Sequence, residues 1–308
     1  QMCIRDRGEL QNCGLPFHFS LGNTDLKMPD VIKHLYKYSP SQGGLLYAWF
    51  PSMHTRVDIM LCGRQGEDIL LSVVDAVYKM LCRLEKMANY YDADSELAYL
   101  NRTASVHPQQ VSHELYDMLT FCVDCYTRTA GCFDVTIHSA DYTPNLIRSV
   151  QLSPQERTLL FLQPGVTINL SGFLKGYALE KTRKLLQHYE VKDALINMGN
   201  SSVLAFGHHP LADGWKVGFG QGAVLNGRKP QELLLQNECL TTSGNDSHER
   251  KHIINPRNGK PVEGKREVAV VTDNGAIGEV LSTGLFVADA RQREILEAEF
   301  RPRLILDL

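Results

Sequence analysis

Apolar positions along the chain switch repeatedly between helical and strand-like spacing. From Glu67 to Met87, apolar side chains recur every three or four residues, which predicts an amphipathic helix. Similar spacing and suitable end residues predict further helices near 28–38 and at 94–101, 112–131, 173–189 and 279–288. β-branched and aromatic runs predict strands at 45–61, interrupted at Pro51, and at 166–170, 194–206, 215–219, 233–235 and 267–272, with a break at Gly199. Because helices and strands mix without a regular β-α-β repeat, the pattern predicts an α+β fold.

The first 44 residues carry little of this pattern. Residues 1–7 resemble the translated end of a sequencing-library adaptor, so we expect them to be an artefact without fold information. The native N-terminus and any export signal are then not visible. Residues 8–44 form an N-terminal segment without a functional interpretation. We expect residues 45–308 to form a single domain with mixed and antiparallel sheets packed by helices, in which the loop at 142–155 is a candidate insertion or hinge.

Composition excludes several classes of protein. The 308 residues contain 32 Lys and Arg against 35 Asp and Glu, a net charge of −3, which argues against a dedicated nucleic-acid binder. A hydrophobic content of 43% excludes a disordered chain. The sequence contains no run of about eighteen apolar residues, so it predicts no transmembrane helix. The pair Cys122 and Cys125 lacks a second pair at zinc spacing, so we expect these thiols to be buried on a helix.

Three segments carry chemistry. In the segment from Asn169 to Tyr177, a strand ends at small residues and a helix begins with Lys175 in its first turn. Such a helix start suits a phosphate group, although a turn with a solvated lysine fits the same residues. The segment Thr241-Thr-Ser-Gly-Asn245 places hydroxyl and N–H groups on a loop, and His252 precedes a proline-containing turn as either a structural or a catalytic histidine.

The third segment is the start of the last predicted helix. Glu279 and Thr283 are four residues apart, so they share one helix face. A carboxylate and a hydroxyl are oxygen ligands that suit Mg²⁺. The alternative is a glutamate stabilised by the helix dipole, with Thr283 bonded to the main chain.

Seven segments in order resemble the ApbE-like FAD:protein FMN transferases. The matching family patterns are A-M-G-T (Ser52–Thr55), Y-x-x-D-S-E-L…L-N (Tyr91–Asn101), G-x-F-D-x-T (Gly131–Thr136), D-L-G-G-I-A-K-G-Y (Asn169–Tyr177), N-x-G-G-D (from Asn197), T-S-G…H-I-I-D-P-R-T-G (Thr242–Gly259) and D-A-L-S-T-A-L-F (from Glu279). The resemblance extends from about residue 45 to about residue 287.

The resemblance implies a function and a set of site residues. Family members bind FAD in a cleft with Mg²⁺ at its pyrophosphate, transfer the FMN half to a threonine hydroxyl of an acceptor protein and release AMP. It implies metal ligation by the side chains of Glu279 and Thr283 and the carbonyl of Leu174. It implies catalytic roles for Lys175 and for His252, the candidate base. Tyr91 matches the residue that stacks on the isoalloxazine ring, and the remaining residues that line the flavin and its diphosphate are Met53, Asp134, Lys175, Ser243 and Gly244.

The resemblance also implies a partner and a location. The acceptor is expected to be a subunit of a membrane redox complex with an exposed threonine. The protein is expected to be periplasmic or attached to the inner membrane, with peripheral membrane association, and no nucleic-acid partner is expected.

Four departures from the family pattern leave alternatives open. Asn169 and Asn255 stand where the family has Asp, Asn200-Ser201 replaces Gly-Asp, and Glu279 replaces a metal-binding Asp. Glu279 keeps the charge with one more methylene, which matters because Mg²⁺ demands near-octahedral geometry. The departures fit a transferase that has drifted, an FAD pyrophosphatase in which water replaces the threonine, or a non-catalytic FAD-binding protein of the cell envelope.

Overall fold

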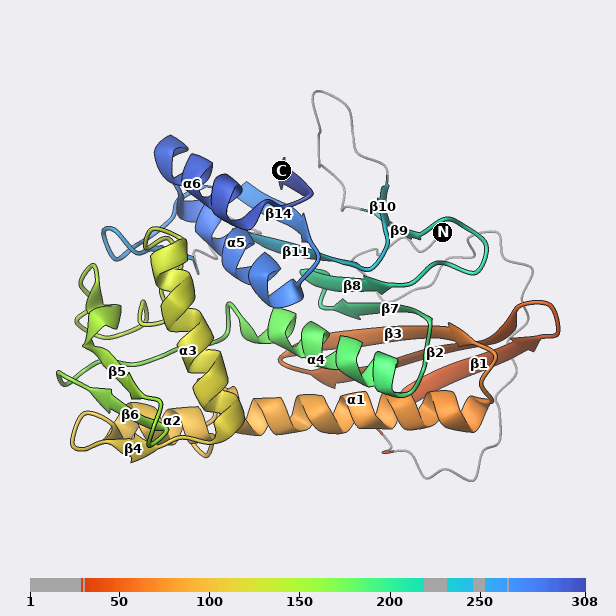
Figure 1. Ribbon diagram of the computed structural model, residues 1–308, viewed down its shortest axis with the longest axis horizontal. Coiled ribbons are helices and arrows are strands. Elements are labelled where there is room, and N and C mark those ends of the chain that lie inside the picture. The colour runs from red at the N-terminus through yellow and green to blue at the C-terminus, as the bar shows by residue number, and fades with distance from the viewer. Residues whose placement is uncertain (1–28, 30, 219–231, 246–252, 265) are drawn as a thin grey trace.

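An eight-stranded sheet forms the centre of the computed structural model (Figure 1). The structure describes residues 29, 31–218, 232–245, 253–264 and 266–308. All neighbouring strands of the sheet are antiparallel. In spatial order they are β1 (Lys33–Ser39), β2 (Gly43–Ser52), β3 (Thr55–Gly63), β7 (Asp193–Met198), β8 (Ser202–Phe206), β11 (Glu238–Asn245), β14 (Arg266–Thr272) and β15 (Leu304–Asp307).

Helices and three small sheets surround this sheet. The helices are α1 (Glu67–Ala88), α2 (Glu96–Thr103), α3 (His113–Arg128), α4 (Leu174–His188), α5 (Gly275–Val287), α6 (Ala290–Phe300) and the 3-10 helix η1 (Leu146–Ser149). The small sheets pair β9 (Trp215–Val217) with β10 (Leu233–Leu235), β12 (Ile254–Asn255) with β13 (Lys260–Pro261), and β6 (Thr158–Phe161) with both β4 (Gln109–Gln110) and β5 (Val150–Ser153).

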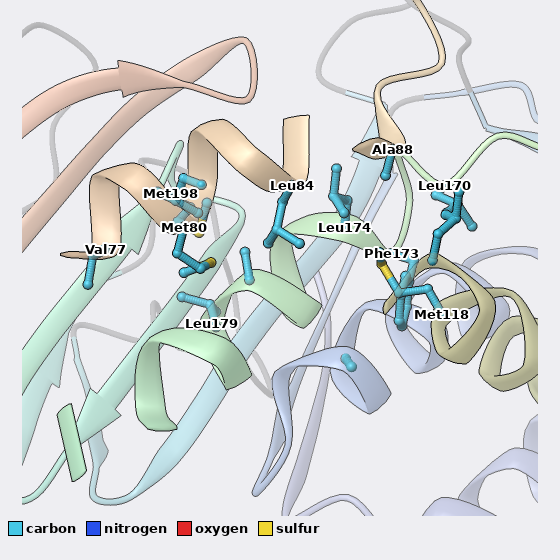
Figure 2. Close-up of a cluster of buried hydrophobic side chains, with 14 of the residues drawn as sticks. Val77, Met80, Leu84, Ala88, Met118, Leu170, Phe173, Leu174, Leu179 and Met198 are labelled. Carbon is cyan, nitrogen blue, oxygen red and sulfur yellow. The ribbon is translucent and has the colours of Figure 1, made fainter. Parts of the chain in front are cut away.

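Three helices cover one face of the central sheet. Helix α1 packs on β2 and on α4, α4 packs on α5, and α5 packs on β11 and β14 (Figure 1). Figure 2 shows the core that results, in which Leu84 of α1, Leu179 of α4 and Met198 of β7 lie in one buried cluster. On the opposite face, the β9–β10 hairpin buries Trp215 against the sheet. In the part of the chain that the structure describes, no helix has both the length and the apolar character that a membrane span requires.

The predicted α+β class and the single domain are confirmed. The helices predicted at 67–87, 94–101, 112–131 and 173–189 correspond to α1, α2, α3 and α4. Helix α5 begins at Gly275, earlier than predicted, because the side chain of Asn274 caps it and accepts a hydrogen bond from the amide of Ile277 at 3.0 Å.

Three predictions from local pattern are wrong. In the helical stretch predicted near 28–38, residues 33–38 instead belong to the edge strand β1, because Lys33–Ser39 pair with β2 over their whole length. The strand at 45–61 is two strands, and the chain turns at Met53 and His54 rather than at Pro51. Residues 166–170 form no strand, because the amides of Ile168 and Asn169 bond instead to the Asn101 side chain and to Val135.

The structure also bears on the break predicted at Gly199 and on the segment 142–155. The break predicted at Gly199 is confirmed, and this residue adopts a φ of +63° in the turn between β7 and β8. The segment 142–155 is more ordered than a loop, since it contains η1 and β5. The central sheet begins at Lys33, inside the predicted N-terminal segment 8–44. Cys122 and Cys125 are both buried in α3, as expected.

Candidate functional site

The first cluster of candidate residues gathers where α4 begins. No side chain caps the N-terminus of α4, and no acidic residue of its own first turn faces the positive end of the helix dipole. Lys175 projects from this first turn, and its Nζ contacts Oγ of Ser201, which follows β7. An ammonium group and a helix start on one side of the molecule favour binding of an anion.

Glu279 lies beside this helix start. Its side chain is 4% exposed, and Oε1 accepts a hydrogen bond from the hydroxyl of Ser202. Burial raises the pKa of Glu279, while the charge of Lys175 and the Ser202 hydrogen bond act in the opposite direction. In the sequence, Ser201 is noticeable only as a departure from the family pattern, and Ser202 carries no signal. In the structure these two serines connect Lys175 to Glu279, because their hydroxyl oxygens lie 3.4 Å apart.

Two glycines allow α4 and α5 to approach closely enough for this arrangement. A Cβ placed on Gly176 would lie 2.6 Å from both Cγ of Glu279 and the carbonyl carbon of Gly275. Real side chains do not tolerate such contacts, so the helix pair requires glycine at Gly176. The close contact between α4 and α5 at Gly176 therefore sets the depth at which Glu279 lies against α4.

The second cluster contains hydroxyl groups one turn along α5. Oγ of Ser243, in β11, lies 2.8 Å from Oγ of Ser282 and 3.0 Å from Oγ1 of Thr283. The neighbouring Gly244 packs against β14, where a Cβ would come within 2.5 Å of Cγ of Glu267. The structure thus brings Ser243 to Thr283, and it gives Gly244 a packing role in the sheet.

The predicted metal ligands come from two helices. Glu279 and Thr283 lie one turn apart on α5, whereas Leu174 is the first residue of α4. In helical geometry the Leu174 carbonyl points along α4 toward the amide of Ala178. Among the described residues, no group of three or more His, Cys, Asp and Glu side chains is arranged to hold a metal. A single buried carboxylate with nearby hydroxyls fits Mg²⁺ that is shared with a diphosphate and water.

A separate, exposed set of rings surrounds Tyr91. The Tyr91 side chain is 67% exposed, and its ring lies nearly perpendicular to those of His54 and Tyr90, at centroid distances of 6.3 and 5.2 Å. Tyr90 in turn lies 6.1 Å from the ring of His138. Of these four rings, only Tyr91 matches a residue of the resembled family pattern; Tyr90 and His138 match none, and His54 stands where that pattern has glycine. An exposed row of rings suits a planar aromatic ligand.

Met53 is held at the tip of the β2–β3 hairpin. Its amide donates to Oε1 of Glu85 at 2.7 Å, and the hydroxyl of Ser52 donates to Oε2 of the same carboxylate at 2.9 Å. Glu85, on α1, therefore fixes the turn that carries Met53 and His54. Sequence reasoning did not single out Glu85, since a charged residue on an amphipathic helix is usually a solvated one.

Asp134 is hydrogen-bonded within the protein through both oxygens of its carboxylate. Its side chain is buried, and Oδ1 accepts bonds from the amide and hydroxyl of Thr136 at 2.8 and 2.6 Å. Oδ2 lies 3.0 Å from the hydroxyl of Tyr142, which also lies 2.9 Å from the carbonyl of Pro256. Burial raises the pKa of Asp134, and these hydrogen bonds oppose the rise. The carboxylate thus ties two loops together.

Two of the departures from acidic residues preserve local structure. Oδ1 of Asn169 accepts from the amide of Ser171 at 2.9 Å, and Oδ1 of Asn255 accepts from the amide of Arg257 at 3.0 Å. An aspartate would accept the same hydrogen bond, so asparagine keeps the turn but replaces a charged acceptor oxygen with an NH₂ donor. Nδ2 of Asn169 is buried and has no partner among the described residues, so a ligand with an acceptor atom would satisfy it. His252 lies outside the described residues.

Comparisons with known proteins agree on one family. The ApbE family model matches residues 53–303. The chain is 25% identical over 269 residues to the FAD:protein FMN transferase of Klebsiella pneumoniae (strain 342), covering 74% of this chain and 82% of that protein. It is 24% identical to the FAD:protein FMN transferase of Chlamydia muridarum (strain MoPn / Nigg) over 249 residues, covering 69% of this chain and 74% of that protein.

Solved structures share the fold. The flavin transferase ApbE from Vibrio cholerae superimposes with a TM-score of 0.71 at 21% identity and covers 82% of this chain and 90% of its own. The apo flavinyl transferase ApbE from Pseudomonas stutzeri gives a TM-score of 0.73 at 17% identity, covering 84% and 89%.

Proposed function

The chain belongs to the ApbE family, and from that premise we propose that it transfers the FMN half of FAD to a threonine hydroxyl of an acceptor protein and releases AMP. The observation that carries the proposal is the buried Glu279, which faces Lys175 at an uncapped helix start. A cation and a helix dipole beside one buried carboxylate suit a diphosphate that shares a divalent metal with the protein.

The proposed reaction exchanges one phosphorus–oxygen bond for another. The threonine oxygen attacks the phosphorus atom of the FMN half, and the bond from that phosphorus to the bridging oxygen breaks. AMP leaves with the bridging oxygen, and the hydroxyl proton passes to a base. Lys175 and the amide groups at the start of α4 stabilise negative charge on the leaving AMP. Glu279 and Thr283 would hold Mg²⁺, which would supply positive charge to the diphosphate.

We assign proton removal to His252. This assignment rests on the family resemblance, because the segment containing His252 lies outside the described residues. Its test is the variant His252→Ala, which we expect to lose FMN transfer while still binding FAD. Normal labelling of an acceptor by this variant would exclude His252 as the base.

The flavin ring is proposed to lie against Tyr91. Support comes from the exposed fraction of this ring and from the perpendicular rings beside it. Nδ2 of Asn169, which has no partner among the described residues, is available to donate a hydrogen bond to a phosphate or flavin oxygen. Together these features provide an aromatic region for the flavin and a cationic region for the diphosphate.

The acceptor and the location are extensions of the same proposal. We propose that the acceptor is a subunit of a membrane redox complex and that the protein acts in the cell envelope, in the periplasm or at the inner membrane. Both rest on the family resemblance alone. Expression from the complete gene, followed by fractionation and flavin detection in the gel, tests them. Flavinylated protein found only in the cytoplasmic fraction would contradict them.

The first experiment measures acceptor labelling and AMP together. Purified protein is incubated with FAD, MgCl₂ and an acceptor fragment that carries one threonine, with a Thr→Ala fragment as the matched control. We expect an FMN-sized mass gain on the threonine fragment, an equal amount of AMP, and loss of both with EDTA. AMP without labelling of this fragment would favour a pyrophosphatase or a different acceptor, and bound FAD without AMP would favour a non-catalytic flavin-binding protein.

A further inference from the structure

The turn between β2 and β3 has an unusual backbone for its sequence. Met53 and His54 adopt φ values of +51° and +56°, and the flanking Ser52 and Thr55 pair directly across the hairpin. Two-residue hairpin turns of this kind favour Asn-Gly, because glycine adopts positive φ without steric penalty. The resembled family pattern, A-M-G-T, has glycine at the second residue of the turn, where this chain has His54. A histidine at such a position is strained, and strain of this kind is often retained for a function.

The imidazole of His54 contacts the proposed flavin-binding tyrosine. Its ring lies 6.3 Å from that of Tyr91, at an interplanar angle of 89°. Nε2 of His54 lies 3.4 Å from Nδ2 of Asn89, and Oδ1 of Asn89 accepts from the amide of Tyr91 at 3.0 Å. Because an amide NH₂ group can only donate, Nε2 is the acceptor in this long, weak contact. His54, Asn89 and Tyr91 therefore form a closed cluster.

His54 also borders a hollow beside the hairpin. The hollow measures about 670 Å³, and its lining includes Lys33, Trp49, Arg56 and His54. The imidazole is thus the side chain shared by this hollow and the ring of Tyr91. Its location is accessible to a ligand and is not part of the buried core.

We propose that His54 is a positioning residue for flavin binding, which holds the plane of the Tyr91 ring while leaving the surface of that ring free for the isoalloxazine. This inference rests on the proposed function, in which Tyr91 carries the flavin. Perpendicular contacts from His54 and Tyr90 restrict rotation of the Tyr91 side chain, so less conformational entropy is lost when flavin stacks on it. The backbone strain at His54 is then retained because the ring improves substrate binding.

The test uses a substitution with opposite expected effects on stability and on binding. His54→Gly relieves the positive φ, so we expect the melting temperature to rise by about 1–3 °C. The same change removes the ring, so we expect the Kd for FAD to rise about 3–10-fold, with weaker quenching of flavin fluorescence. Glu190→Gly is the matched control, because Glu190 has the same φ of +56° and is exposed after α4. It should raise the melting temperature without changing the Kd.

A double-mutant cycle asks whether His54 acts through Tyr91. In a Tyr91→Ala background, His54→Gly should have no further effect on the Kd for FAD. His54→Asn, which tolerates positive φ but lacks the ring, should weaken binding as glycine does. The proposal is overturned if His54→Gly binds FAD as tightly as the parent, or if its effect is undiminished in Tyr91→Ala. If the parent protein itself does not bind FAD, the proposed function fails, and this inference fails with it.

Discussion

The two halves of the candidate site are built in opposite ways. The half between α4 and α5 is buried: Glu279 is 4% exposed, its carboxylate is hydrogen-bonded by Ser202, and Gly176 has no room for a side chain. The half around Tyr91 is open, and this ring is 67% exposed. The first half is held by packing, whereas the second is held by contacts between rings at the surface.

This difference determines how each half responds to mutation. A buried polar group must have partners within the protein, so a change there alters folding and chemistry together. An exposed ring gains its main partner only when a ligand binds, so a change there alters affinity and leaves the fold intact.

The largest expected effect is on activity at Glu279. Glu279→Gln keeps the shape of the side chain but removes its charge, so we expect FMN transfer to fall by about 100-fold or more and Mg²⁺ affinity to fall with it. Labelling of the acceptor and a magnesium titration followed by calorimetry measure the two effects. Near-normal activity in this variant would show that Glu279 does not bind the metal.

The change in stability of Glu279→Gln relative to the parent also has an expected direction. Because burial raises the pKa of Glu279, the folded protein holds a proton there more tightly than the unfolded chain does. The parent therefore loses stability from this group as pH rises above about 4.5, the ordinary value for a glutamate. We expect Glu279→Gln in EDTA to melt at or above the parent's temperature at pH 7. A clearly lower temperature would contradict this account of the buried carboxylate.

The next effect is on the contact between α4 and α5. Gly176→Val places atoms within 2.6 Å of Glu279 Cγ, so we expect a loss of about 2–3 kcal/mol in the free energy of unfolding, together with loss of transfer. Urea unfolding followed by circular dichroism measures the change. Gly66→Ala is the control, because a Cβ there meets nothing within 4 Å. Equal stability of the two variants would show that the helices can separate freely.

The exposed half should respond in the opposite sense. Tyr91→Ala is expected to weaken FAD binding about tenfold, near 1.4 kcal/mol, with no more than a small change in melting temperature. Tyr91→Phe is the conservative control and should bind FAD nearly as the parent does. Fluorescence titration gives both values. A large loss of stability in Tyr91→Ala would remove the contrast between the two halves.

The smallest expected effect lies at the hydroxyl cluster. Ser243→Ala removes the contacts to Ser282 and Thr283, and we expect a loss of about 0.5–1.5 kcal/mol in the free energy of unfolding. Transfer should fall only modestly if Thr283 still reaches the metal. Denaturant midpoints and initial rates distinguish these outcomes, and a loss of activity as large as in Glu279→Gln would place Ser243 in direct contact with substrate.

The spacing of apolar residues correctly predicted those elements whose ends and buried face depend on residues close in the sequence. The helix at 67–87 was predictable because its apolar spacing matches one buried face of α1. The strand β1 was not, because its half-buried residues adopt their conformation through pairing with β2. Local pattern also did not predict the hairpin turn at Met53 and His54, because neither residue is typical of positive φ and Glu85 of α1 holds the turn; only the resemblance to the A-M-G-T turn of the family indicated it.

By itself, the sequence determined the fold class, most helices and the segments that resemble the ApbE family, because periodicity and short motifs are local properties. It also placed Glu279 and Thr283 on one helix face. Only the tertiary structure brought Ser202 to Glu279 across 77 residues, joined Lys175 to Ser201, and set His54 against Tyr91. Such contacts depend on how the elements pack: the glycine contact between α4 and α5 sets the depth of Glu279, and the strained hairpin turn aims the imidazole at an exposed ring.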